Sequence, residues 1–160
     1  MLGLTLGLVL AEGAFWWRDA GAFPHLNLYT VDPVLGVRLE PNASMKLRVA
    51  SNDVTTMQTN SLGYRAPEWR TPALGEVLVV GDSQVFGLGV ENDETFSAKL
   101  SGLLKVNVLN GGVPTYGPRE YTAVVKEVLA TRKVNTVVYV LNLSNDLFEV
   151  DRPNLQRHAV

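Results

Sequence analysis

The chain contains no cysteine and only two histidines among its 160 residues. The missing cysteines exclude disulfide bonds and cysteine-based zinc sites, and they leave the redox compartment open. The net charge is only −2 at pH 7 and no basic cluster occurs, so nothing in the sequence indicates nucleic-acid binding. Internal repeats and low-complexity tracts are also lacking. With 46% hydrophobic residues, the chain is long enough to form one domain with a buried core.

Three apolar runs are each followed by a short polar or glycine-containing loop. The runs are residues 77–80, 106–109 and 137–141. Runs of this length that are rich in β-branched residues are typical of strands buried on both faces of a sheet. Between them, residues 93–105 and 118–133 carry apolar residues at helical spacing, and Pro118 suits a first helical turn. This alternation predicts parallel strands with right-handed crossovers, so the three loops meet at one edge of the sheet.

The first loop contains the strongest candidate for a nucleophile. Residues 81–83 read Gly-Asp-Ser and follow the first strand at its carboxyl end, where open α/β sheets bind ligands. A serine hydroxyl attacks an ester only when it is exposed and a base removes its proton, and the end of a strand supplies the exposure. Considered alone, Ser83 also fits a helix N-cap, and Asn145 in the third loop also fits an ordinary turn residue.

In order and spacing, the three loops resemble the sequence blocks of the SGNH (GDSL-type) serine hydrolases. Residues 81–83 resemble the first block, residues 110–117 (Asn-Gly-Gly-Val-Pro-Thr-Tyr-Gly) the second, and residues 144–146 (Ser-Asn-Asp) the third. Residues 35–36 (Leu-Gly) and 60–65 (Asn-Ser-Leu-Gly-Tyr-Arg) are similar to a segment that precedes the nucleophile in membrane-associated bacterial members. The likeness covers most of the chain.

The resemblance implies a three-layer αβα fold with a flavodoxin-like parallel sheet. It also implies an esterase, acyl hydrolase or acyltransferase that works through an acyl-serine intermediate, with no metal or organic cofactor. Preorganised donors around the developing oxyanion are the main source of catalysis in such a site. The site residues implied are Ser83 as nucleophile and donor of a backbone N–H, Thr115 or Gly117 and Asn145 as further oxyanion donors, and Asp82 and Asn110 as supporting residues.

The chain departs from the family pattern in two ways. Thr115 occupies a position that is often glycine, which leaves Thr115 and Gly117 as alternative donors. The family's Asp-x-x-His block, which activates the serine, is missing, because His25 lies ahead of the nucleophile and His158 has Leu155 three positions before it. We therefore expect the sheet to be incomplete, the chain to be truncated before that block, and the 160 residues alone to show little esterase activity.

Two segments are expected ahead of the hydrolase domain, which would occupy residues 76–160. Residues 1–22 begin with an apolar stretch at residues 1–17 that ends in aromatic residues, which predicts a membrane anchor or a signal-like segment. Membrane association and a place in the cell envelope follow from it, and the alternative is an amphipathic helix packed on the domain of a cytoplasmic protein. Residues 23–75 are expected to form a small β-rich layer. Its clearest alternating stretches are residues 45–49 and 54–57.

Two other functions stay open beside the hydrolase. A flavodoxin-like nucleotide-binding module would use residues 81–89 to cradle a phosphate, although this loop lacks both the P-loop ending and the dinucleotide fingerprint. A pseudo-enzyme that binds acyl or glycan ligands without turnover would explain the missing base. For the hydrolase, the expected partner is a small-molecule, glycan or lipid ester, and the sequence does not narrow this class.

Overall fold

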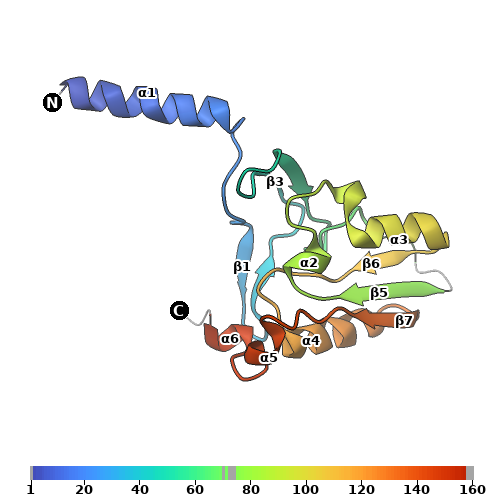
Figure 1. Cartoon of the computed structure of the whole chain (residues 1–160). Helices are drawn as coiled ribbons and strands as arrows, with labels where there is room; N and C mark the ends of the chain where they lie inside the picture. The colour runs from blue at the N-terminus through green and yellow to red at the C-terminus, as the bar shows by residue number, and fades with distance from the viewer. Residues whose placement is uncertain (1, 70, 72–74, 158–160) are drawn as a thin grey trace.

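A parallel β-sheet organises the fold, and two small antiparallel sheets lie beside it (Figure 1). The structure is a computed structural model that describes residues 2–69, 71 and 75–157. The elements in chain order are α1 Leu2–Arg18, β1 Tyr29–Asp32, β2 Gly36–Leu39, β3 Ser44–Leu47, β4 Thr55–Gln58, β5 Glu76–Val80, α2 Ser83–Phe86, the 3-10 helix η1 Asn92–Glu94, α3 Phe96–Leu104, β6 Val108–Asn110, α4 Pro118–Leu129, β7 Val134–Tyr139, α5 Asp146–Glu149 and α6 Asn154–Arg157.

The parallel sheet has the strand order β6-β5-β7. β5 lies in the middle and pairs in parallel with both neighbours, so that Val79 is in register with Asn110 of β6 and with Val138 of β7. All five residues of β5 are buried. The predicted parallel strands are thus confirmed, although β6 begins at residue 108 instead of 106 and β7 at residue 134 instead of 137. β7 begins earlier because its pairing with β5 extends back to Glu76.

Helices pack against both faces of this sheet. Alternate residues of a strand face opposite sides. Leu78 of β5 belongs to the core cluster that contains Tyr121 of α4, whereas Val79 belongs to a second cluster against which Leu100 of α3 packs. The chain is therefore a mixed α/β protein with a three-stranded parallel sheet. The helix expected at residues 93–105 is divided, because Thr95 caps α3 and separates it from η1.

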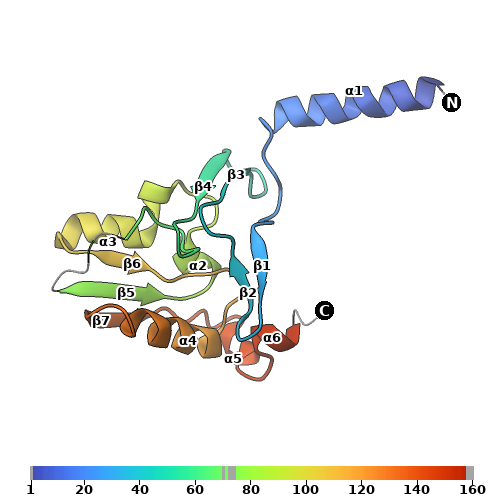
Figure 2. The ribbon, with the colours of Figure 1, turned by 180° about the vertical axis from the view of Figure 1, so that it is seen from behind.

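The small sheets pair β1 with β2 and β3 with β4, in each case antiparallel. The second pair confirms the predicted strands near residues 45–49 and 54–57, whereas the first pair was not predicted. β1 and β2 stand beside α2, at the carboxyl end of the parallel strands (Figures 1 and 2). The last helix, α6, closes against β2, where the Nδ2 of Asn154 donates a 2.9 Å hydrogen bond to the carbonyl of Leu35.

Helix α1 corrects the expectation of a membrane anchor. It projects away from the rest of the molecule (Figures 1 and 2), and the side chains of residues 3–18 are all exposed, so it is not the packed amphipathic helix either. Its 17 residues span about 25 Å at 1.5 Å per residue, less than the about 30 Å of a bilayer's hydrocarbon core. Within the described residues, none of the helices has both the length and the apolar character to cross a membrane. This finding contradicts the predicted membrane-spanning anchor, whereas the signal-like alternative stays a prediction.

Candidate active site

Ser83 follows the buried central strand directly and is the first residue of the one-turn helix α2. It is half-buried, between the buried Asp82 and the exposed Gln84. Asp82 is the N-cap of α2, and its Oδ1 accepts a 2.8 Å hydrogen bond from the N–H of Gln84. The capping role that a lone serine could have had therefore belongs to Asp82, and the Ser83 hydroxyl is not used for it.

Two glycines allow the neighbouring loops to close around α2. A Cβ atom added to Gly81 would lie 2.4 Å from Cγ2 of Val85, and one added to Gly112 would lie 2.4 Å from the backbone nitrogen of Phe86. Real Cβ atoms do not approach other atoms so closely. The first and second loops therefore meet across α2 at a separation that only glycine permits.

The other carboxylate oxygen of Asp82, Oδ2, connects the first loop to the third. Its Oδ2 accepts a 2.9 Å hydrogen bond from the Nδ2 of Asn142, which follows β7. The N–H of Asn142 in turn donates to Oδ2 of Asp146 at 2.8 Å. The chain segments that carry Ser83 and Asn145 are thus joined by a side-chain bond across the ends of β5 and β7. Sequence reasoning missed Asn142, although its place directly after an apolar run was a usable signal.

Asn110, the last residue of β6, shapes the second loop. It is buried, and its Oδ1 accepts a 3.0 Å hydrogen bond from the N–H of Gly112. The N–H of Val113 donates to the carbonyl of Gly81 at 3.2 Å, which attaches this loop to the end of β5. The second and first loops are therefore neighbours through backbone bonds as well as through packing.

The structure distinguishes the two alternative oxyanion donors, Gly117 by a hydrogen bond and Thr115 by its backbone conformation. The N–H of Gly117 donates a 3.0 Å hydrogen bond to Oε2 of Glu120, which caps the start of α4. This N–H can therefore meet an oxyanion only if the cap breaks. Thr115 has φ +77°, in the left-handed region that β-branched residues rarely adopt. Such conformations cost about 1–3 kcal/mol and concentrate at functional sites.

Asn145 is the N-cap residue of α5, but its side chain makes no capping hydrogen bond. Its Oδ1 is buried and has no hydrogen-bond partner among the residues that the structure describes. Nearly all buried polar atoms are paired, so an orphan of this kind marks a place where a water or a ligand group completes the pairing. The Oδ1 of Asn145 is thus not consumed by local structure, and the Nδ2 of the same carboxamide is the atom that can donate to an oxyanion.

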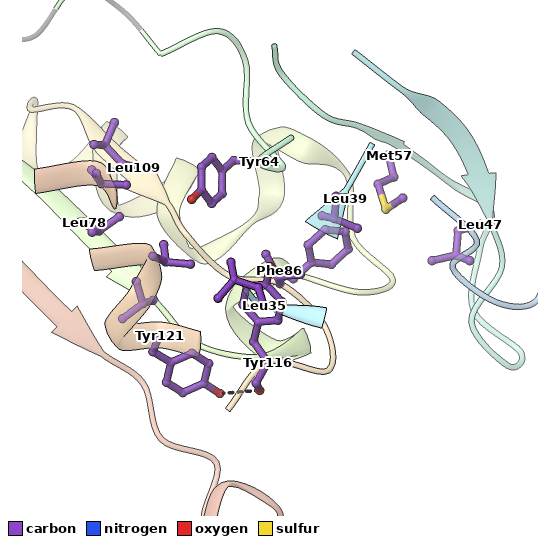
Figure 3. Close-up of a cluster of buried hydrophobic side chains, with 14 of the residues drawn as sticks. Leu35, Leu39, Leu47, Met57, Tyr64, Leu78, Phe86, Leu109, Tyr116 and Tyr121 are labelled. Carbon is purple, nitrogen blue, oxygen red and sulfur yellow. Dashed lines mark hydrogen bonds between the residues drawn. The ribbon is translucent and has the colours of Figure 1, made fainter. Parts of the chain in front are cut away.

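A buried tyrosine links the third loop to the second. The hydroxyl of Tyr121 donates to both carboxylate oxygens of Asp146, at 3.1 and 3.3 Å, and lies 3.2 Å from the carbonyl of Tyr116 (dashed line in Figure 3). Burial, followed by the negative charges of Asp146 and Asp82, raises the pKa of Tyr121 well above its usual range. The phenol therefore stays protonated and keeps donating at any physiological pH.

No histidine of the described residues is placed as a base for Ser83. His25 is exposed on the connection between α1 and β1, and His158 lies outside the described residues. Within the described part of residues 2–157, the Ser83 hydroxyl donates no hydrogen bond. Over the same part, no group of three His, Asp or Glu side chains is arranged to hold a metal ion.

Two cavities open elsewhere on the molecule. One of about 630 Å³ lies between residues 66–69 and the edge formed by α3 and β6, and includes Trp69 and Lys105 in its lining. The other, of about 510 Å³, lies between residues 51–55 and the loop after α2 and includes Glu91. Ser83 lines neither of these two cavities.

A scan against protein-family models and a search of curated proteins both returned no match to this chain. The case for a function therefore depends on the three loops and on the contacts between them.

Proposed function

We propose that the chain is an SGNH-type serine hydrolase that cleaves or transfers the acyl group of an ester. With this function we propose the three-layer αβα, flavodoxin-like arrangement of that family, a small-molecule, glycan or lipid ester as substrate, and a place in the cell envelope. In the proposed reaction, the Ser83 Oγ attacks the carbonyl carbon while its proton passes to solvent water, and the carbonyl oxygen becomes an oxyanion. When the oxyanion collapses, the bond to the alcohol breaks and the alkoxide takes up a proton from solvent. Water or a second alcohol then attacks the acyl-serine and releases the acyl group, and Ser83 regains its proton.

The observation that carries the proposal is the bond between Asp82 and Asn142. It joins the loop of the candidate nucleophile to the loop of a carboxamide that has no structural task. A donor fixed in place before the reaction costs no reorganisation when charge develops, and losing one such donor typically costs about 2.7–4 kcal/mol. The N–H of Ser83, the N–H of Thr115 and the amide of Asn145 are the donor set that we propose.

The test compares two serines of the same chain. A fluorophosphonate is reacted with the whole protein, and peptide mapping by mass spectrometry gives the second-order rate at Ser83 and at the exposed Ser51. Positioning and oxyanion donors without a base leave about 10³–10⁴-fold over water in triad-deleted proteases, so we expect Ser83 to react about 10³ times faster than Ser51. The Ser83→Ala and Ser51→Ala variants identify the two labels. Equal rates at the two serines would overturn the proposal.

A nucleotide-binding module, the main rival, gives a different result in the same samples. The purified protein would then retain a flavin or nucleotide, seen by absorbance after denaturation, while Ser83 would react no faster than Ser51. A retained flavin or nucleotide, together with no selective labelling of Ser83, would contradict the hydrolase and support the nucleotide-binding module.

A pseudo-hydrolase is the second candidate, and the missing hydrogen bond between Ser83 and a base within the described residues favours it. The hydrolysis of p-nitrophenyl acetate separates the two functions. We expect little turnover by the 160-residue chain, and added imidazole should raise the Ser83-dependent rate because a general base typically contributes 10²–10⁴-fold. Strong Ser83-dependent turnover without imidazole would show that a base lies within the chain, with His25 and His158 as the first residues to replace.

A further inference from the structure

Arg65 is a buried arginine with no carboxylate of the described residues within hydrogen-bond distance. It precedes β5 in the chain, is 2% exposed, and places its guanidinium among backbone carbonyls. Burial lowers the pKa of Arg65 to about 10 against the opposing effect of Glu91, which still leaves the side chain charged at neutral pH. An unpaired buried charge is costly, so the groups that surround it must compensate.

The groups that compensate all follow the candidate nucleophile. Nη1 donates to the carbonyl of Phe86 at 3.3 Å and to that of Gly87, and Nη2 donates to the carbonyl of Val90. Nε donates to Oδ1 of Asn92 at 2.9 Å. The guanidinium carbon also lies 5.1 Å from the centre of the Phe86 ring, a cation–π contact. One side chain thereby holds four successive points of the segment from residue 86 to residue 92.

Helix α2 needs such contacts because it is only one turn long. A single helical turn does not form stably by itself, and the last carbonyls of a helix have no partners within it. Asp82 satisfies the N-terminal end of α2. At the other end Gly87 turns the chain with φ +87°, and the cation of Arg65 pairs with carbonyls that have no partner within the helix.

The apolar side of α2 packs toward the small antiparallel sheets. Phe86 is fully buried and lies in one cluster with Leu35 and Leu39 from the region of β2 (Figure 3). Ser83 is therefore attached to the parallel sheet at one end of α2 and to the small antiparallel sheets at the other.

We propose that Arg65 is the positioning residue that fixes α2, and with it Ser83, from the C-terminal end of the helix. The inference deepens the proposed function and rests on it for the role of Ser83. It gives the small sheets a task in the site, because the segment that carries Arg65 links β4 to β5. The competing interpretation is that Arg65 only attaches the two parts of the molecule to each other.

The test uses Arg65→Lys and Arg65→Met, with Arg38→Met as the matched control. Arg38 also joins the small sheets to the core, through Glu127 of α4, and its hydrogen bonds do not involve α2. Hydrogen exchange measures the amides of Gly87 and Leu88, which donate to the carbonyl of Ser83. The fluorophosphonate rate at Ser83 is measured in the same folded samples, and urea unfolding supplies the global stability of each variant.

We expect Arg65→Met to speed the exchange of these two amides at least tenfold beyond the change in global stability. The same variant should slow labelling of Ser83 by about tenfold to hundredfold, since small misplacements of a reacting group have effects of this size. Arg65→Lys should show smaller changes in both the amide exchange and the labelling rate. Arg38→Met should change neither the exchange nor the labelling rate. If Arg65→Met does not fold, Arg65→Lys and Asn92→Ala, which removes the acceptor of Nε, must still show both effects in smaller form.

Equal changes in Arg65→Met and Arg38→Met, after correction for global stability, would overturn the inference, as would unchanged exchange and labelling in Arg65→Lys and Asn92→Ala. Failure of the proposed function has a separate signature. If Ser83 in the unaltered protein reacts no faster than Ser51, the hydrolase is rejected, while the exchange of Gly87 and Leu88 still decides whether Arg65 holds α2.

Discussion

The parallel sheet and the small antiparallel sheets are stabilised by different forces. The central strand β5 is buried along its whole length by apolar neighbours on both faces. The small sheets and the segment that follows β4 contact the helices of the core through polar groups as well. Arg38 of β2 lies 2.5 Å from Glu127, and the hydroxyl of Tyr64, which follows β4, lies 3.3 Å from Glu127. Apolar burial involves no charges that salt can screen, whereas exposed ion pairs weaken as salt is added. The two parts should therefore respond differently to the same perturbation.

The largest expected effect comes from the centre of the parallel sheet. Leu78→Ala removes a fully buried side chain and should lower the free energy of unfolding by about 2–5 kcal/mol, with little dependence on salt. Leu141→Ala, past the end of β7 where the side chain is 54% exposed, should change it by less than about 0.5 kcal/mol. Urea unfolding at low and high salt measures both. Similar losses for the two variants would mean that β5 is not the centre of stability.

A smaller effect is expected where the antiparallel sheets meet the core. Arg38→Met removes ion pairs to Asp32 and Glu127, and partly exposed pairs of this kind contribute about 0.2–1 kcal/mol. The loss should shrink in 1 M salt, because screening weakens the pairs in the unaltered protein. A loss that stays constant with salt would assign Arg38 a packing role instead.

Low pH should also affect the stability of the small sheets more than that of the parallel sheet. Burial acts to raise the pKa of Asp32, but hydrogen bonds from the N–H of Leu35, from Arg38 and from the N–H of Val34 outweigh it and hold the pKa below its usual range. Stability from this carboxylate is therefore present above the unfolded pKa of about 4 and is lost as the pH falls through the lower folded value. Below pH 4 the unaltered protein should lose stability more steeply than Asp32→Asn, as followed by urea unfolding at several pH values.

The smallest effect is expected from removing α1. A chain that begins at Phe23 loses only exposed helix and a few polar contacts, such as the 3.4 Å pair of Arg48 with Asp19. Phe23 itself keeps its backbone bonds to Lys46 and Arg48 beside β3. We expect the melting temperature to change by no more than about 2 °C, which corresponds to less than about 1 kcal/mol. Unfolding of the shortened chain would instead show that α1 belongs to the core.

The sequence predicted the central strand well and its neighbour β7 less well, for a physical reason. Both are apolar runs rich in β-branched residues, and β5 ends at Val80, directly before Gly81, as expected. Which run occupies the middle of the sheet depends on pairing between distant segments, so the exposure of Tyr139 at the edge, 44%, has no local signal. The strands β1 and β2 were missed because buried and exposed residues do not alternate along them, whereas they do alternate along β3, which has the same length of four residues.

In the candidate site too, some residues could be placed from the sequence and other contacts could not. Asp82 and Ser83 could be placed from the sequence, because a polar pair directly after a buried strand has only one place to lie. The engagement of Gly117 by Glu120 depends on where α4 begins. The bonds from Arg65 to the segment from residue 86 to residue 92 connect residues 21 to 27 positions apart. Such contacts between distant residues exist only after the chain has folded, so no local pattern predicts them.

The closure of α6 on β2 has a consequence for the time course of folding. The hydrogen bond from Asn154 to the carbonyl of Leu35 spans 119 residues. A Cβ atom on Gly36 would lie 2.8 Å from the backbone of Leu155, so the two segments fit only when both are in their final shape. Contacts of long sequence separation form slowly. At about 5–20 residues per second, a ribosome needs roughly 6–24 s to add 119 residues. During synthesis, β2 is therefore present for many seconds before α6, the helix that packs against it, has been made.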